Sequence, residues 1–321
     1  MKLSIIIPHF NDHGRLAEAV SNVQTRCAPD TEVVIVDDHS SKAGVFPTGK
    51  NIRIHRNERN VGPSESRNMG VTLATGDYVM FLDSDDLLLS APSRILARVE
   101  KMHGAPDIIL CNMEDGRLPK PLLAHQNCLR RFEDDIFFSK VVHFTPHLYR
   151  KDFLVETAKP FPTDLRLGED LVFIINSLAR SKNLITLDET TYQYRRRSGS
   201  LSSRHYDLED HYTLLERIPE LFRLALADFP DHRQVRLSIM FVYRVRNAVR
   251  ALDSFTNADP LRILTALRML SSLGLAKSSH LREAAQVYWP VSLDHLLDLL
   301  EEADDDTVLN YLKENKKTFL P

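Results

Sequence analysis

The stretch Tyr78–Asp86, YVMFLDSDD, passes from five apolar residues directly into four polar ones. An apolar run of this kind is typical of a strand that is buried on both faces of a parallel sheet. Two earlier stretches, Leu3–Asn11 (LSIIIPHFN) and Glu32–Ser40 (EVVIVDDHS), change from apolar to polar in the same way. Because ligands bind beyond the carboxyl ends of such strands, we expect the three polar clusters to open on one edge of one sheet.

Helical patterns separate these strands. Apolar residues recur at helical spacing in 12–26, and the segments 64–74 and 90–103 have the same character. Further strands are predicted at 52–55 and 107–111. This alternation predicts an α/β domain with a mostly parallel sheet flanked by helices.

Beyond residue 204 the pattern changes, because strand signals almost vanish. Apolar stripes at helical spacing recur there, in 214–225, 233–253, 260–273 and 293–303. We therefore expect a catalytic domain over 1–204 and a helical C-terminal region over 205–321. The helical region has no catalytic signature of its own. Acceptor binding, a homo-oligomer contact and simple support of the first domain stay open as its role.

Composition narrows the class of protein. The chain has 321 residues, a net charge of -3 and no dominant basic stripe, so we expect no nucleic-acid partner. The cysteines Cys27, Cys111 and Cys128 are widely spaced, as in a reducing compartment. No stretch approaches the roughly 18 apolar residues that cross a bilayer, and the N-terminal apolar run is too short for a signal peptide. The expected location is cytoplasmic, with peripheral contact at the inner face of the membrane left open.

The acidic cluster after Tyr78–Leu82 is the first candidate for chemistry. Alternate residues of an extended segment point the same way, so Asp83 and Asp85 can converge on one point. Converging carboxylates repel each other unless a cation lies between them, and Mg²⁺ or Mn²⁺ prefers such oxygen ligands. The alternative is that Ser84 or Asp85 only caps the following helix.

Two further clusters fit a nucleotide. Asp38 could accept a hydrogen bond from a uracil-like base or a ribose hydroxyl, or it could only shape a turn. Asn60–Asn68 combines a Gly62-Pro63 turn, a helix start and Arg67 one turn further on. A helix N-terminus beside an arginine is a ready contact for an anion, although an ordinary capped helix would have the same sequence.

Together these motifs resemble family 2 of the bacterial glycosyltransferases, which have the GT-A fold. The motifs are Pro8-x-Phe10-Asn11, Val36-Asp37-Asp38-x-Ser40, Asn60-x-Gly62-x-Ser64-x-x-Arg67-Asn68 and Phe81-Leu82-Asp83-Ser84-Asp85-Asp86. Three later stretches look like further signatures of the family: 148–154, 168–173 and 192–202. The resemblance covers roughly residues 2–203. One departure is His9, where the family often has Tyr.

The resemblance implies an enzyme that moves a sugar from a nucleotide diphosphate donor, by analogy a UDP-sugar, to an acceptor hydroxyl. It implies Mn²⁺ or Mg²⁺ held mainly by Asp85, with Asp83 beside it towards the donor. The implied donor contacts are Pro8, Phe10, Asn11, Asp38, Asn60, Gly62, Arg67, Asp83, Ser84, Arg195, Arg197 and Ser200. The Glu169-Asp170 pair would supply the catalytic base, with Asp170 favoured and Glu169 as the alternative. The alternative is that both only complement a helix dipole.

The run Arg195-Arg196-Arg197 can also be interpreted without the resemblance. Arg195 and Arg197 alternate along an extended segment and so share a face, and Ser200 follows in a Gly-Ser continuation that could close over a diphosphate. A solvated charge run is the alternative. His143 and His147 could line the acceptor or sugar pocket, or could be surface or packing residues.

The expected reaction is a single displacement that inverts the anomeric carbon, because no second nucleophile is evident. The processive polymerases' Gln-x-x-Arg-Trp signature is absent, which favours transfer of single sugars. A cell-surface glycan or a lipid-linked intermediate is the expected acceptor. Two other hypotheses remain: a sugar-nucleotide nucleotidyltransferase, which would need a Gly-rich basic loop after the first strand, and a catalytically inactive nucleotide-binding relative.

Overall fold

The computed structural model describes residues 1–114, 128–129, 143–156, 159–195, 206–214, 216–217, 261–262, 264–265, 268 and 292–314. The chain forms two compact units. The first comprises residues 1–134, 140–164 and 169–203, and the second comprises 135–139, 165–168 and 204–321. Arg197 and Ser200 lie outside the described residues.

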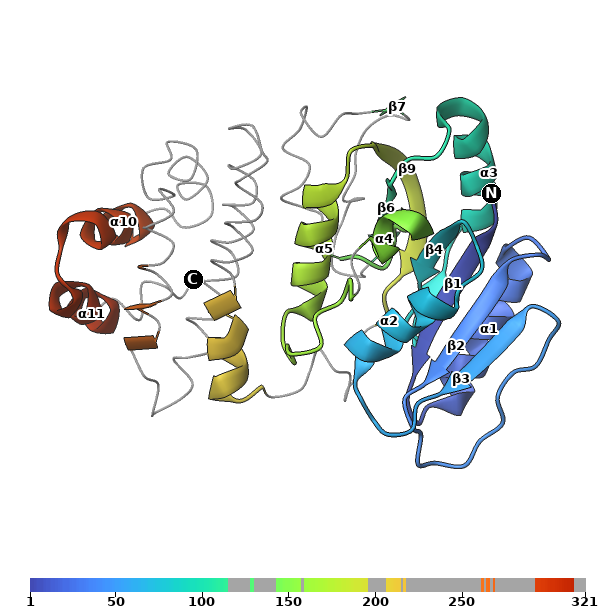
Figure 1. Cartoon of the computed structure of the whole chain (residues 1–321), viewed down its shortest axis with the longest axis horizontal. Coiled ribbons are helices and arrows are strands. Elements are labelled where there is room, and N and C mark those ends of the chain that lie inside the picture. Colours follow the sequence, from blue (N-terminus) through green and yellow to red (C-terminus); the bar gives the residue numbers. More distant parts are fainter. Residues whose placement is uncertain are drawn as a thin grey trace. The chain divides into compact units, whose positions relative to one another are not determined.

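The first unit holds the sheet and its helices (Figure 1). In chain order the elements are β1 (Leu3–His9), α1 (His13–Arg26), β2 (Glu32–Asp37), β3 (Ile52–Arg56), α2 (Pro63–Leu73), β4 (Tyr78–Phe81), β5 (Leu87–Leu88), α3 (Pro92–His103), β6 (Ile108–Glu114), β7 (Cys128–Leu129), β8 (Leu148–Arg150), α4 (Lys151–Val155), α5 (Glu169–Arg180) and β9 (Leu184–Gln193).

The strand order is β3-β2-β1-β4-β8-β6-β9-β5, with β7 also paired to β9. The strands β3, β2, β1 and β4 are parallel, as the apolar runs predict. The second half of the sheet is mixed, because β8 is antiparallel to both β4 and β6, and β5 is antiparallel to β9. Sequence patterns do not indicate β8 or β9 as strands, since β8 is only three residues long and β9 mixes apolar with polar residues.

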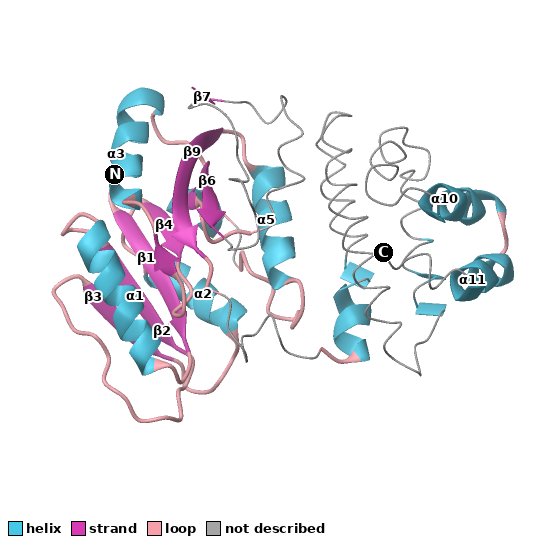
Figure 2. Cartoon of the chain, turned by 180° about the vertical axis from the view of Figure 1, so that it is seen from behind, coloured by secondary structure: helices cyan, strands magenta, loops and turns pink. Residues whose placement is uncertain are grey.

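Helices cover both faces of the sheet. On the face seen in Figure 2, α1 and α3 contribute Leu16, Val20 and Leu96 to one core with inward residues of β1 and β4. Apolar residues at this helical spacing bury one stripe of each helix, which is why the amphipathic patterns predicted these elements. The opposite face holds an aromatic cluster, in which the Phe81 ring of β4 lies 5.7 Å from the Phe173 ring of α5.

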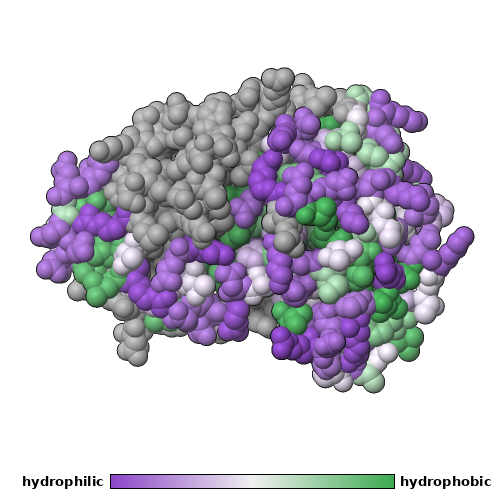
Figure 3. Space-filling view, in the orientation of Figure 1, coloured by the Kyte–Doolittle hydropathy of each residue, from purple (hydrophilic) through white to green (hydrophobic). Residues whose placement is uncertain are grey.

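The second unit is described in part. Its described elements include α10 (Ser292–Glu302) and α11 (Asp305–Glu314), and residues 208–214 are also helical. No helix among the described residues is both long and apolar enough to cross a membrane. On the face seen in Figure 3, the described residues are mostly polar, with groups of apolar residues between them.

Candidate active site

The loops after β1 and β2 are tied together by Asn11. This residue has a φ of 63°, in the left-handed region that asparagine tolerates better than most residues. Its side-chain carbonyl accepts hydrogen bonds from the N–H groups of Ser41 and Lys42, at 2.8 and 2.9 Å. Its own N–H donates to Ser40 Oγ at 2.8 Å. One short side chain therefore fixes the relative position of two loops at the carboxyl edge of the sheet.

Asp37 and Asp38, at the end of β2, are both engaged by the chain itself. Asp37 is fully buried, accepts from the N–H and the hydroxyl of Ser40, and pairs with Arg56 at 3.1 Å. Asp38 accepts from the N–H groups of Val61 and Gly62, both at 2.8 Å. These contacts pull the loop before α2 onto the end of β2.

Asp38 also accepts from the side chain of Asn57 at 3.0 Å, so these bonds use three of the roughly four acceptor positions of its carboxylate. Asn60 adds a hydrogen bond to the Asp38 carbonyl at 3.2 Å. Gly62, with a φ of 89°, then starts α2. Asp38, Asn60 and Gly62 thus lie together, and their contacts build a loop.

Arg67 is a buried cation at the centre of the site. Its side chain is 6% exposed and packs over the rings of Phe144 and Phe161, at 4.8 and 5.4 Å from their centroids. Its Nη2 donates to Asp83 at 2.9 Å, and its Nη1 lies 3.8 Å from Glu169 Oε1. Arg67 therefore joins the acidic segment after β4 to the first residue of α5.

Burial by itself would lower the pKa of Arg67, but Asp83, Glu169 and Asp170 outweigh it and raise the pKa above its usual value. Burial and the charge of Asp170 raise the pKa of Glu169, and the charge of Arg67 opposes them. Asp170 Oδ1 accepts from the N–H of Leu171 at 2.7 Å. The predicted catalytic pair and the predicted donor-facing Asp83 are therefore electrostatically linked through one arginine.

The segment Asp83–Asp86 is partly exposed over its first three residues, whereas Asp86 is 1% exposed. Burial, followed by the charge of Asp83, raises the pKa of Asp86 to about 7. Asp86 accepts hydrogen bonds from the hydroxyl of Tyr192 and the N–H of Arg195. It is thus a buried neighbour of the predicted metal residues, and the resemblance assigned it no role.

The carboxylates of Asp83 and Asp85 are ligands of the kind that a divalent cation binds. Asp83 Oδ1 accepts a hydrogen bond from Arg67, and Asp85, two residues further on, is partly exposed. In the part of the chain that the structure describes, no group of three or more His, Cys, Asp and Glu residues is arranged to hold a metal ion. Carboxylate oxygens are ligands that Mg²⁺ and Mn²⁺ accept, and a cation held here would need phosphate oxygens and water as its remaining ligands, the coordination that Mg²⁺ commonly keeps.

His143 and His147, in the loop before β8, have different surroundings. His147 is 3% exposed, its Nδ1 accepts from the N–H of Cys111 at 3.1 Å, and burial lowers its pKa to about 3. His147 is therefore a packing residue, one of the two alternatives that the sequence left open. His143 is half-buried and stacks on Tyr194, with ring centroids 6.2 Å apart.

Sequence reasoning missed Phe144, Phe161 and Glu18. Phe144 and Phe161 lie under Arg67, and Glu18 pairs with Arg195 at 2.7 Å. No local signal marks these residues, because each acquires its partner only through long-range folding. Of the other predicted donor residues, Phe10 is 44% exposed, whereas Pro8 and Ser84 are half-buried.

Residues 4–153 match the family described as glycosyl transferase family 2. This match covers residues 4–153 of the 321-residue chain, and it agrees with the family resemblance of the motifs. A crystal structure of Staphylococcus aureus TarS 1-349 in complex with UDP-GlcNAc superposes with a TM-score of 0.76 at 22% identity, covering 99% of this chain and 92% of that one. The GT-A fold is thereby confirmed.

Among curated proteins, this chain is similar to the poly(ribitol-phosphate) beta-glucosyltransferase of Bacillus spizizenii. The two are 28% identical over 261 residues, which are 76% of this chain and 40% of the relative. It is also similar to the poly(ribitol-phosphate) beta-N-acetylglucosaminyltransferase TarP of Staphylococcus aureus, at 31% identity over 206 residues, 60% of this chain and 62% of TarP. The chain thus spans less than two thirds of the length of these relatives.

Proposed function

We propose that this chain is an inverting, non-processive glycosyltransferase that uses a UDP-sugar and transfers its hexose or N-acetylhexosamine to a hydroxyl of a poly(polyol phosphate) of the teichoic acid type. The observation that carries the proposal is the link through Arg67, which ties Asp83 to Glu169 at the start of α5. The names of the relatives, which act on poly(ribitol-phosphate), support the acceptor class. The UDP-GlcNAc complex of a protein with the same fold supports the donor class.

In this mechanism Asp170 accepts the proton of the acceptor hydroxyl while that oxygen forms its bond to the anomeric carbon. The bond between the anomeric carbon and the diphosphate oxygen breaks on the opposite face, so one displacement inverts the configuration and releases UDP. Mn²⁺ or Mg²⁺ held at Asp85 would supply Lewis-acid stabilisation of the leaving diphosphate. Arg67 holds Glu169 close to Asp83 and balances part of the negative charge around the reaction.

The base assignment follows from the surroundings of the two carboxylates. Glu169 is already an ion-pair partner of Arg67, and its raised pKa suits a group that hydrogen-bonds hydroxyls of the acceptor or the donor sugar. Asp170 has no ion pair with Arg67 within 4.0 Å among the contacts of the described residues. Asp170 is therefore the better candidate for the base.

Donor chemistry is tested first without an acceptor. The protein is incubated with a panel of UDP-sugars and Mn²⁺, and UDP is measured. Slow release of UDP from one or a few donors supports a transferase. Formation of UTP that depends on added pyrophosphate would instead indicate a nucleotidyltransferase, and binding without turnover an inactive relative.

Acceptor chemistry is then tested with the preferred α-linked donor. Poly(ribitol phosphate), poly(glycerol phosphate) and a neutral glycan are compared, and the new linkage is examined by NMR. We expect a β-linked product on a polyol phosphate. An α-linked product would contradict the inverting mechanism, and transfer to the neutral glycan alone would contradict the acceptor class.

A further inference from the structure

The acidic segment Asp83–Asp86 is held from behind by Tyr192 at the end of β9. Tyr192 is fully buried, and its hydroxyl accepts a hydrogen bond from the N–H of Asp83 at 3.2 Å. The same hydroxyl lies 2.6 Å from Asp86 Oδ2. Since a phenol has one proton and the Asp83 N–H already donates to it, that proton must point at Asp86.

Both oxygens of Asp86 therefore face donors. The second oxygen, Oδ1, accepts from the backbone N–H of Arg195 at 2.7 Å. Asp86 is 1% exposed, so water cannot replace either partner without an opening of the structure. A buried carboxylate with two fixed donors has one strongly preferred orientation.

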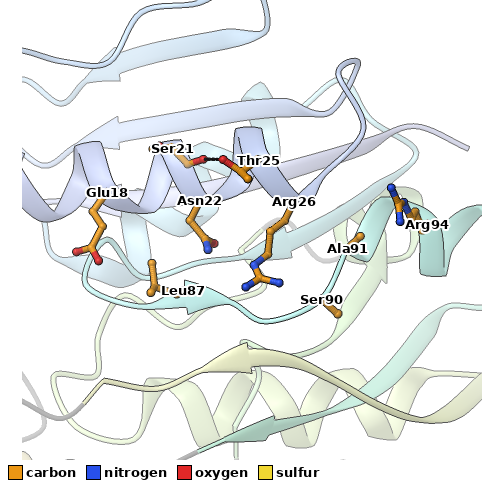
Figure 4. Close-up of a pocket in the computed structure, with 9 residues that line it drawn as sticks. All are labelled: Glu18, Ser21, Asn22, Thr25, Arg26, Leu87, Ser90, Ala91 and Arg94. Atoms are coloured by element: carbon orange, nitrogen blue, oxygen red, sulfur yellow. Dashed lines mark hydrogen bonds between the residues drawn. The ribbon is translucent and has the colours of Figure 1, made fainter.

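Arg195 adds contacts to the same segment through its side chain. Its Nε donates to the backbone carbonyl of Asp85 at 2.7 Å, and its Nη1 donates to Glu18 of α1 at 2.7 Å. Figure 4 shows Glu18 at one end of a pocket between α1 and the chain around β5. There Asn22 makes two hydrogen bonds to the backbone of Leu88, at 3.2 and 2.8 Å.

We propose that Tyr192, Asp86 and Arg195 are positioning residues, which hold the backbone of Asp83–Asp86 in one conformation so that Asp83 and Asp85 already face the donor diphosphate before it binds. The inference rests on the proposed function, because it assigns the segment to the donor. It gives Arg195 a supporting role, whereas the sequence predicted a direct contact with the diphosphate. Charged groups that are oriented in advance contribute more to binding than groups that must first be ordered.

The sharpest test is Tyr192→Phe, which removes one hydroxyl and keeps the buried ring. Its matched control is Tyr78→Phe, because Tyr78 is also fully buried and its hydroxyl also donates a hydrogen bond, to the carbonyl of Pro106 at the far end of β4. Both variants should lose similar thermal stability. Only Tyr192→Phe should weaken UDP binding, by about tenfold as measured by calorimetry with Mn²⁺, the worth of one hydrogen bond to a charged group.

Amide hydrogen exchange without any ligand gives an independent readout. Tyr192→Phe should speed exchange of the N–H groups of residues 83–88, and Tyr78→Phe should not. If the two variants have equal UDP affinity and equal exchange in this segment, the proposal is overturned. If the wild-type protein fails to bind UDP, the proposed function fails, and the exchange result alone then decides whether the three residues hold the segment.

A double-mutant cycle separates a connected network from unrelated damage. Asp86→Asn replaces one carboxylate oxygen by an NH2 group, which then faces one of the two donors, and removes the negative charge, so it should weaken UDP binding more than Tyr192→Phe does. Because the two residues share one hydrogen bond, the double variant should lose clearly less affinity than the two single losses added together. Additive losses would overturn the proposed network.

Discussion

Two groups of carboxylates have opposite surroundings: one lies at the end of β2, and the other comprises the segment after β4 and the start of α5. Asp37 and Asp38 accept hydrogen bonds from the chain's own loops, and Asp37 has a partner in Arg56. In the second region, five carboxylates crowd together in the described part of the chain: Asp83, Asp85, Asp86, Glu169 and Asp170. The fully buried cation among them is Arg67.

This difference supports our proposal that the second region performs the chemistry. A carboxylate whose acceptor positions are filled by backbone N–H groups stabilises a loop, whereas carboxylates in excess over cations attract a metal ion or a proton. We therefore assign the region after β2 to shaping the nucleotide end of the site. The region after β4, with the start of α5, is assigned to the reaction.

Removal of divalent cations should have the largest effect on the second region. We expect a chelator such as EDTA to abolish transfer, and Mn²⁺ or Mg²⁺ to restore it, because the repelling carboxylates and the diphosphate need a cation between them. Asp85→Asn should raise the Mn²⁺ concentration that gives half-maximal activity. Full activity in the chelator would remove the metal role of Asp83 and Asp85.

Asp170→Asn should lower transfer by at least about 100-fold, the usual contribution of a positioned base. UDP affinity, measured by calorimetry, should change little. The matched variant is Glu169→Gln, which keeps the shape of the neighbouring residue and should lose less activity. Should Glu169→Gln prove the more damaging of the two, the base is Glu169.

Arg67→Met should destabilise the fold by about 2–3 kcal/mol, because it leaves the partly buried carboxylates of Asp83 and Glu169 without their counter-charge. The matched change in the first region is Arg56→Met, whose side chain is 51% exposed, and it should cost only about 1 kcal/mol. Both values come from denaturant unfolding near pH 7. Equal losses would show that the two regions do not differ in the way described above.

The smallest effect at neutral pH is expected at His9, at the end of β1. Burial, together with the charge of His13, lowers the pKa of His9 to about 4 from 6.5, and neither ring nitrogen has a hydrogen-bond partner among the described residues. Between pH 6.5 and 4 the unfolded chain binds a proton that the folded His9 does not bind, so stability falls as the pH falls through this window.

His9→Phe removes the contribution of His9 to the pH dependence of the unfolding free energy. It should leave the unfolding free energy at pH 7.5 nearly unchanged and should reduce its loss at pH 5 by about 2 kcal/mol. Denaturant unfolding at the two pH values measures this difference. An identical pH dependence in both proteins would contradict a neutral, buried His9.

Sequence patterns predicted the strongly periodic parts of the molecule. The apolar runs Leu3–Ile7, Glu32–Val36 and Tyr78–Leu82 predicted parallel strands whose polar ends share one edge, and β1, β2 and β4 have that arrangement. The short strand β8 and the mixed strand β9 were missed, because their pairing is decided by partners far along the chain. For the same reason Phe144 and Phe161, the residues under Arg67, carried no local signal.

The sequence by itself determined the α/β class, the shared edge and the types of residue at that edge, because hydrophobic periodicity and the residues that follow each strand are local properties. Only the tertiary structure decided what each of those residues does. Asp38 and Asp83 look alike in the sequence, yet one accepts hydrogen bonds from backbone N–H groups and the other binds a buried arginine. The state and role of a carboxylate depend on burial and on neighbouring charge, and both arise when distant segments pack together.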